Sequence, residues 1–195
     1  GVDPVISCPA NQTVNTDFNQ CGAIVNYPTP TATDNCTANP SVARISGPAQ
    51  GGFFSTGTTT VTWRATDGAG NTDDCSFTVT VNDNQNPTIS CPANINVNSS
   101  SSACGSLQTF TGTASDNCPG VTISTLSALG SGDIFPVGTT TVTLRATDGS
   151  SLFTNCSFTV TVNDITAPVI SCPPNQTLNN DPGDCFATVS WAAAT

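Results

Sequence analysis

The sequence predicts an all-β protein made of tandem, disulfide-stapled β-sandwiches, and three observations support this prediction. All 13 acidic residues are Asp, and Glu, Lys, His and Met are absent, so many strong helix formers are missing. Strand-forming and turn-forming residues replace them, with 33 Thr, 19 Asn, 16 Gly and 14 Pro. The third observation is an internal repeat, because Cys8 and Cys91 lie 83 residues apart and Cys91 and Cys172 lie 81 apart in nearly identical segments.

The repeat divides the chain into three parts. The recurring segments are 3–15, which returns at 86–98 and 167–179; 57–68, which returns at 138–149; and 75–83, which returns at 156–164. We therefore expect one sandwich over residues 1–83 and a second over residues 84–164. Residues 165–195 are expected to be the N-terminal part of a third, incomplete repeat.

Apolar side chains alternate with Thr along the strand-like segments of each repeat. Val61, Trp63 and Ala65 share one face of such a segment, which indicates a strand with one buried side. The other positions expected to point inward are Phe77, Val79, Val81, Val142, Leu144, Ala146, Phe158, Val160 and Val162, together with the equivalent aromatic residues Tyr27, Phe110 and Trp191. Several short strands with this patterning, separated by turn clusters, are typical of an immunoglobulin-like sandwich.

The composition excludes several classes of function. Without His, Lys or Glu the chain cannot build a Ser-His-Asp triad, a Cys-His pair or a His metal site, so we expect no enzyme. A net charge of −10 with three Arg argues against nucleic acid as a partner. No apolar run approaches the roughly 20 residues that a membrane-spanning helix needs, so we expect no membrane span in this segment.

The recurring motifs resemble the HYR (hyalin repeat) domain across essentially the whole chain. They are C-P-x-N, a second Cys, A-T/S-D-N-C, F-x-x-G-T-T-T-V-T, A-T-D-G and C-S-F-T-V-T-V-N-D, with one departure at residues 53–57, where the first repeat has F-F-S-T-G and the second has I-F-P-V-G. The resemblance implies an extracellular, immunoglobulin-like module, implicated in adhesion and found in tandem. The Lys-poor, Thr-rich and Asn-rich composition is similar to repeat arrays of giant surface adhesins of Bacteroidota, including gliding-motility adhesins.

Ten cysteines predict a disulfide framework of a secreted protein. Four cysteines per repeat allow three connectivities, and strands of alternating direction favour pairs within each end of a sandwich. The expected pairs are Cys8–Cys21, Cys36–Cys75, Cys91–Cys104, Cys118–Cys156 and Cys172–Cys185. The alternative is reactive or metal-binding thiols, although the spacings match no zinc-ligand pattern.

Asp residues recur at the ends of the predicted strands. Asp83 ends the last strand of the first repeat, whereas Asp116 and Asp148 lie in loops expected at the facing end of the second. We expect these three carboxylates to converge across the short linker, where hard oxygen ligands suit Ca²⁺; residues 81–84 also resemble the calcium-binding linker of cadherins. The alternative is turn chemistry, in which Asp side chains bind nearby backbone amides. No cofactor is required, and Ca²⁺ is the candidate ion.

These observations predict a structural or adhesive segment of an extracellular fibre or stalk, partnered by neighbouring repeats or by copies of itself. The alternative is a binding module whose loops recognise a carbohydrate or a matrix or host protein. Nearly all the aromatic residues fall on inward-facing positions, which favours the structural role. Whether the third repeat is completed by the same chain or by another copy stays open.

Overall fold

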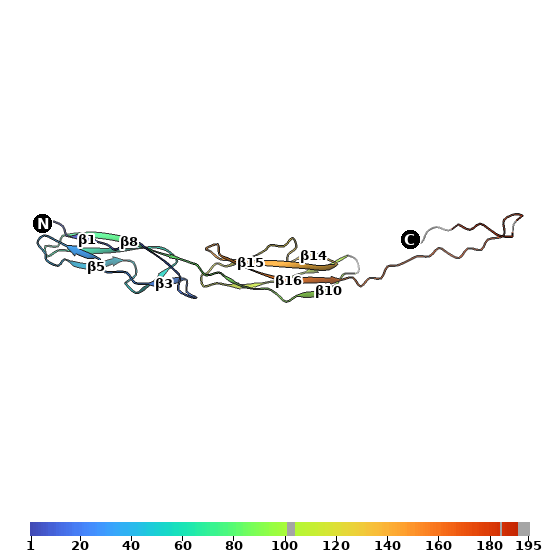
Figure 1. Cartoon of the computed structure of the whole chain (residues 1–195), viewed down its shortest axis with the longest axis horizontal. Helices are drawn as coiled ribbons and strands as arrows, with labels where there is room; N and C mark the ends of the chain where they lie inside the picture. The colour runs from blue at the N-terminus through green and yellow to red at the C-terminus, as the bar shows by residue number, and fades with distance from the viewer. Residues whose placement is uncertain (101–103, 184, 191–195) are drawn as a thin grey trace.

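Strands are the regular elements of this chain, as the sequence predicts. The computed structural model describes residues 1–100, 104–183 and 185–190, and two elongated sandwiches lie end to end in it (Figure 1). Sandwich 1 contains β1 (Val5–Ser7), β2 (Gln12–Asn15), β3 (Gly22–Val25), β4 (Thr31–Thr33), β5 (Ser41–Ser46), β6 (Gly52–Ser55), β7 (Gly57–Thr66) and β8 (Thr72–Asn82). Sandwich 2 contains β9 (Thr88–Ser90), β10 (Ile95–Asn98), β11 (Gly105–Gln108), β12 (Thr113–Ser115), β13 (Thr122–Thr125), β14 (Asp133–Pro136), β15 (Gly138–Thr147) and β16 (Phe153–Asn163). Among the described residues, no helix is long and apolar enough to cross a membrane.

Each sandwich packs one four-stranded sheet against two two-stranded sheets. In sandwich 1 the large sheet has the order β2-β8-β7-β5, and the small sheets are β1-β4 and β3-β6. In sandwich 2 the corresponding orders are β10-β16-β15-β13, β9-β12 and β11-β14. The pairs β2–β8 and β10–β16 are parallel, and the other pairs are antiparallel. The first strand of each repeat is therefore split, with one half in each layer.

The predicted inward-facing side chains form two separate cores. The buried residues are Ala23, Val25, Tyr27, Phe54, Val61, Phe77, Val79 and Val81 in sandwich 1, and Phe135, Val142, Leu144, Phe158, Val160 and Val162 in sandwich 2. Trp63 and Phe110 are half-buried against these cores, and Trp191 lies outside the described residues. Burying each large apolar side chain contributes about 1.5–3 kcal/mol, so the alternating pattern supplies the main stabilising force.

Tyr27 adds a polar anchor to the first core. Its ring packs edge-on against Phe77, with centroids 5.0 Å apart, and its hydroxyl donates to the Pro48 carbonyl at 2.7 Å. Phe110 takes the same place against Phe158 at 4.9 Å in sandwich 2 and has no hydroxyl to satisfy. Burial raises the pKa of Tyr27, because the phenolate would lose its hydration in this core.

The disulfides differ from the predicted pairs. Cys8 is bonded to Cys75 with their Cα atoms 5.7 Å apart, and Cys91 is bonded to Cys156 with Cα atoms 5.8 Å apart. Each bond ties the first strand of a repeat to its last strand. The predicted pairs Cys8–Cys21, Cys36–Cys75, Cys91–Cys104 and Cys118–Cys156 are therefore wrong.

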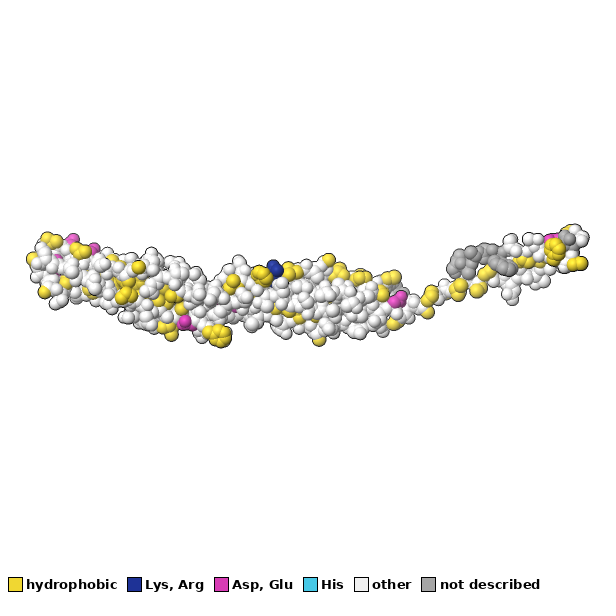
Figure 2. All heavy atoms as spheres, in the orientation of Figure 1, with side chains coloured by type: hydrophobic (Ala, Val, Ile, Leu, Met, Phe, Trp, Pro, Cys, Tyr) yellow, Lys and Arg dark blue, Asp and Glu magenta, His cyan; other side chains and the backbone are white. Residues whose placement is uncertain are grey.

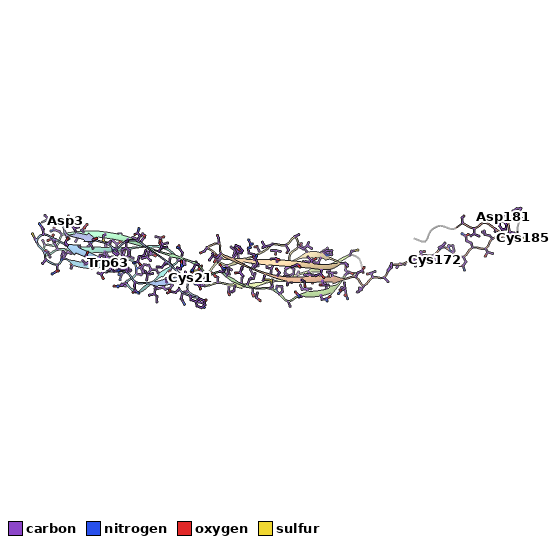
Figure 3. The ribbon with its side chains drawn as sticks, in the orientation of Figure 1. Asp3, Cys21, Trp63, Cys172, Asp181 and Cys185 are labelled. Atoms are coloured by element: carbon purple, nitrogen blue, oxygen red, sulfur yellow. A yellow bond between two sulfur atoms is a disulfide. The ribbon has the colours of Figure 1, made fainter. Side chains whose placement is uncertain are left out.

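The split first strand is the physical reason for this error. If the first strand were continuous and the second ran antiparallel to it, Cys8 and Cys21 would lie at the same end of the sandwich. Between them the chain instead forms β2, which pairs in parallel with β8 and carries the chain to the far end. Figure 3 shows Cys21 at that far end, beside sandwich 2, whereas Asp3 lies at the opposite end.

Residues 164–183 and 185–190 extend beyond sandwich 2 and contain no strand (Figure 1). Cys172 and Cys185 are exposed and carry no disulfide among the described residues, so the structure does not form the predicted Cys172–Cys185 pair there. This segment includes counterparts of the first strands of a repeat but none of β7 and β8.

Uncharged polar groups cover most of the face shown in Figure 2, and charged side chains are sparse on it. Outward-facing hydroxyls pair across the long hairpins, as in Thr58–Thr80 at 3.0 Å and Thr139–Thr161 at 3.1 Å. Cross-strand pairs of this kind support a sheet on its solvent side. The abundance of Thr is thus explained by strand formation on a hydrated face.

Candidate functional site: the joint between the sandwiches

The candidate functional site lies where the two sandwiches meet. Sandwich 1 contributes the β2–β3 loop, residues 16–21, and the linker, residues 83–87, that follows β8. Sandwich 2 contributes the β12–β13 loop, residues 116–121. We call these three segments the joint.

A disulfide crosses the joint. Cys21 of the β2–β3 loop is bonded to Cys118 of the β12–β13 loop, with Cα atoms 4.7 Å apart and a sequence separation of 97. The two sandwiches are therefore connected twice, once by the peptide linker and once by this bond. Prediction from the sequence missed this arrangement, because it considered only pairs within one repeat.

Gln85 holds the linker against sandwich 1. Its side-chain amide donates to Thr16 Oγ1 at 2.9 Å and to the Asp17 carbonyl at 3.0 Å, and its Oε1 accepts from the Asn19 amide at 2.9 Å. Its own backbone amide donates to Asp83 Oδ1 at 3.2 Å. Four hydrogen bonds at one residue fix the path of the chain out of sandwich 1.

Asn117 makes the corresponding contact from sandwich 2. Its Nδ2 donates to the Gln20 carbonyl at 2.9 Å and to Asp83 Oδ1 at 3.2 Å. The neighbouring Cys118 amide donates to Asp116 Oδ2 at 3.0 Å, which fixes the loop that carries the disulfide. Polar contacts and a covalent bond thus act on the same short interface.

Two carboxylates also meet in the joint. Ligand atoms of Asp83, Asp116 and Cys118 lie within 4.8 Å of one another. Cys118 is disulfide-bonded and so cannot supply the thiolate that a metal would bind, which leaves the two Asp side chains. Asp83 Oδ2, Asp116 Oδ1 and Asn117 Oδ1 are buried and have no hydrogen-bond partner within the described chain. These are hard oxygen donors of the kind that Ca²⁺ takes.

Asp148 is not among the side chains that converge there. Its Oδ1 accepts from the Ser150 amide at 2.9 Å and the Leu152 amide at 2.8 Å, inside the β15–β16 turn. Its Oδ2 is buried without a hydrogen-bond partner among the described residues. The structure therefore brings together Asp83 and Asp116 of the three predicted residues and uses Asp148 in a turn.

Turn chemistry also accounts for the equivalent Asp residues of sandwich 1. Asp34 Oδ2 accepts from the Cys36 amide at 2.8 Å and the Thr37 amide at 2.7 Å. Asp67 accepts from the Asn71 side chain at 2.8 Å, and this hydrogen bond is the main cause that holds the pKa of Asp67 below its usual value. Hydrogen bonds from turn amides are therefore common to these Asp residues, and Asp83 and Asp116 in addition come together across the joint.

Phe18 departs from the expected burial of aromatic residues. It lies in the β2–β3 loop beside the joint, and 83% of its surface is exposed. A signal was present in the sequence, because Phe18 falls within a polar loop segment and not on an alternating strand. Phe18 is thus an exposed aromatic residue on a loop of the joint.

Comparison with solved structures returns extracellular cadherin repeats. The first four repeats of Drosophila N-cadherin match with a TM-score of 0.42 and 13% identity, covering 85% of this chain and 50% of that one. Repeats 22–24 of mouse cadherin-23 match with a TM-score of 0.39 and 17% identity, covering 84% and 65%.

Comparison with curated proteins returns hyalins. Hyalin of Strongylocentrotus purpuratus is 36% identical over 178 residues, which are 87% of this chain and 14% of that protein. Hyalin of Lytechinus variegatus is 36% identical over 166 residues, covering 82% and 30%. A rat protein with sushi, von Willebrand factor type A, EGF and pentraxin domains is 31% identical over 176 residues, covering 88% and 5%. The chain thus spans less than a third of each of these relatives.

The HYR domain model matches this chain twice, at residues 2–81 and 82–162. The two matches cover both sandwiches described above. HYR domains are modules of extracellular, adhesion-type proteins, and three disulfides fit such an oxidising location. The chain belongs to the HYR domain family.

Proposed function

We propose that this chain is a load-bearing segment of an extracellular adhesive fibre or stalk. The observation that carries the proposal is the second connection across the joint, the Cys21–Cys118 disulfide. A loosely linked pair of binding modules has no need of it. A rod that must transmit tension and keep its direction gains stiffness from a short linker, a covalent bond beside it and the hydrogen bonds of Gln85 and Asn117. The Lys-free composition further supports a place among surface adhesins of the Bacteroidota type.

The internal disulfides define the path that tension takes. Cys8 follows β1, and Cys75 lies in β8, the strand that leads into the linker. A pull on the ends of sandwich 1 therefore passes from Cys8 through the disulfide to Cys75 and bypasses the strands between them. Cys91 and Cys156 do the same in sandwich 2. Even an unfolded sandwich can lengthen only by the short segments outside these loops.

Single-molecule pulling on the chain tests this proposal. Because the bypassed loops span 67 and 65 residues, reduction should add about 230 and 220 Å to the two contour lengths released on unfolding. The Cys36→Ser variant is the matched control, since it removes an exposed cysteine that carries no disulfide in this chain, and it should leave the release lengths unchanged. Release lengths that are already full without reductant would contradict the proposal.

We further propose that Ca²⁺ binds between Asp83 and Asp116 and stiffens the joint. Buried, unpartnered oxygens of both side chains and of Asn117 support this proposal. Calorimetric titration with CaCl₂ should give a binding heat that the Asp83→Asn and Asp116→Asn variants lose. Asp34→Asn is the matched control, because Asp34 is the counterpart of Asp116 at the outer end of sandwich 1. Absence of heat in the unsubstituted chain, with no effect of a chelator on melting, would refute Ca²⁺ binding.

Phe18 supports the second candidate function, a module whose loops bind a carbohydrate or a protein ligand. An aromatic side chain exposed on a loop offers a flat apolar surface for such contacts. The test is a glycan and matrix-protein binding screen with the chain and with Phe18→Ala. Binding that Phe18→Ala abolishes would support this function. If the chain binds no glycan and no matrix protein in the screen, the proposed ligand-binding function of this loop is refuted.

A further inference from the structure

Two unbonded cysteines occupy the same repeat positions as the two cysteines of the joint. Cys36 and Cys118 both follow Asp-Asn in the loop after the fourth strand of their repeats, and Cys104 and Cys21 both immediately precede the strand that begins with Gly. Within the described residues Cys36 and Cys104 are exposed and carry no disulfide. Cys36 lies at the outer end of sandwich 1, and Cys104 lies at the outer end of sandwich 2.

The outer end of sandwich 1 repeats the geometry found on sandwich 2 at the joint. Asp34 Oδ2 accepts from the Cys36 amide at 2.8 Å, and Asp116 Oδ2 accepts from the Cys118 amide at 3.0 Å. The second oxygens of Asp34 and Asp116 are both buried without a hydrogen-bond partner in the part of the chain that is described. Sandwich 1 therefore presents outward the same loop that sandwich 2 uses to contact its neighbour.

The outer end of sandwich 2 repeats the geometry found on sandwich 1 at the joint. The Ser99 amide donates to the Asn163 carbonyl at 2.8 Å, next to the loop of Cys104. The Thr16 amide donates to the Asn82 carbonyl at 2.9 Å, next to the loop of Cys21.

The start of the linker is repeated as well. Asp164 Oδ1 accepts from the Thr166 amide at 2.9 Å, as Asp83 Oδ1 accepts from the Gln85 amide at 3.2 Å. Each sandwich thus carries one half of a joint at each end.

We propose that Cys36 and Cys104 are halves of further disulfides between sandwiches. Cys104 bonds the Asp-Asn-Cys loop of a following HYR sandwich, and Cys36 bonds the cysteine that stands at the Cys21 position of a preceding one. The independent observation is Cys21–Cys118 itself, in which the same two positions are already bonded to each other. By the same rule Cys172 pairs with the last cysteine of its own repeat, and Cys185 pairs with the sandwich after it.

The chemistry is ordinary thiol–disulfide exchange. Two thiols lose two protons and two electrons and form one S–S bond, while a disulfide oxidant, either an oxidoreductase or a small-molecule disulfide, is reduced to two thiols. The exposed sulfur atoms of Cys36 and Cys104 are accessible to such an oxidant. The product is a fibre in which both the peptide linker and a disulfide cross every joint. Cleavage of one linker therefore does not separate the sandwiches.

The experiment isolates the native protein that contains this segment from the cell surface without reductant. Free thiols are blocked with iodoacetamide, the protein is digested with pepsin at acid pH to suppress exchange, and linked peptides are identified by mass spectrometry. We expect the peptides of Cys36 and Cys104 to be linked to the second-position and third-position cysteines, respectively, of neighbouring HYR repeats. Alkylated Cys36 and Cys104, or bonds to any other position, would overturn the proposal.

Gel electrophoresis of the same sample identifies the source of the neighbouring repeat. Bonds within one polypeptide leave a single band whose mass is unchanged by reductant. Bonds between copies give a ladder that reductant collapses to one band. Either result supports the proposal when the linked positions are the expected ones.

This inference rests on the proposed function, and the same peptide map distinguishes their failures. A map that contains Cys21–Cys118 but shows alkylated Cys36 and Cys104 would leave the joint intact and would reject its extension along the fibre. A map without Cys21–Cys118 would reject both.

Discussion

The joint and the outer ends of the two sandwiches contain equivalent cysteines, which are disulfide-bonded at the joint and unbonded at the outer ends. At the joint, Cys21 and Cys118 are bonded and half-buried, whereas their counterparts Cys104 and Cys36 are unbonded and exposed. The surrounding backbone hydrogen bonds are alike in both places. The difference shows that each end of a sandwich is preorganised by its own loops, and that a neighbour supplies the bond without reshaping the loop.

The largest effect is expected from the disulfide inside a sandwich. Replacing Cys8 and Cys75 by Ala opens a loop of 67 residues, which should cost about 4 kcal/mol by the chain-entropy argument. For a domain of this size that corresponds to a loss of about 20 °C in melting temperature. Calorimetry should show this loss in sandwich 1 alone, and Cys36→Ser should melt like the unsubstituted chain. Equal effects of the two variants would contradict the distinction between bonded and unbonded cysteines.

Loss of the disulfide across the joint should affect the relative motion of the two sandwiches more than the stability of either one. In the Cys21→Ser, Cys118→Ser double variant both cores and both internal disulfides are intact, so each sandwich should fold. The two sandwiches should then reorient independently, which nuclear spin relaxation detects as tumbling times shorter than that of the rigidly joined pair. A tumbling time in the double variant as long as that of the unsubstituted chain would mean that Gln85 and Asn117 hold the joint without the disulfide.

The stabilities of the two sandwiches should depend differently on pH in alkaline solution. Tyr27 has a raised pKa when folded, so the unfolded chain loses the phenol proton first and the stability of sandwich 1 should fall as the pH rises above the usual value of 10.0. Sandwich 2 has Phe110 at this place. Thermal melting against pH should show the loss in sandwich 1, and Tyr27→Phe should remove it at a cost of about 1 kcal/mol near neutral pH for the Pro48 hydrogen bond.

The Asn71 contact in the turn of the first long hairpin should make the stability of sandwich 1 depend on pH in acid. In sandwich 1 the Asn71 side chain lowers the pKa of Asp67, and in sandwich 2 Leu152 stands in place of Asn71. A lowered pKa contributes stability that is present above the unfolded value near 3.8 and is lost as the pH falls through the folded value. Asn71→Leu should reduce this acid dependence in a pH titration of melting. An unchanged titration would show that Asn71 does not control Asp67.

The smallest effect is expected on the exposed faces of the long hairpins. Arg64 and Asp74 form a two-point ion pair at 2.7 and 2.8 Å, whereas Arg145 donates to Asn155 at 3.0 Å and stacks 4.1 Å over Phe153. Exposed ion pairs contribute little and are screened by salt. Asp74→Asn should lower the melting temperature slightly at low salt and not at high salt. A shift that persists in high salt would point to lost packing instead.

The sequence predicts the cores better than it predicts the connections between them. Val61, Val79 and Val142 follow a period of two, and that period alone assigns them to the inner face. Asp83 and Asp116 could be expected at facing ends, because strand direction fixes which loops meet. The parallel pairing of β2 with β8 has no local signature, so the prediction placed Cys8 and Cys21 at the same end.

A bond between repeats is also invisible to any reading that treats each repeat alone. Cys21 and Cys118 occupy different positions within their repeats, and only the end-to-end arrangement brings them together. Asp148 instead accepts two amide hydrogen bonds inside its own turn. The Cys21–Cys118 bond thus depends on how the chain folds between distant residues.

A disulfide map of this 195-residue chain is the direct test of the covalent bond across the joint. The chain is alkylated without reduction, digested with pepsin at acid pH and examined for linked peptides. We expect the links Cys8–Cys75, Cys91–Cys156 and Cys21–Cys118, with alkylated Cys36 and Cys104 in the isolated chain. Links that pair Cys8 with Cys21 and Cys118 with Cys156 would show that no disulfide crosses the joint.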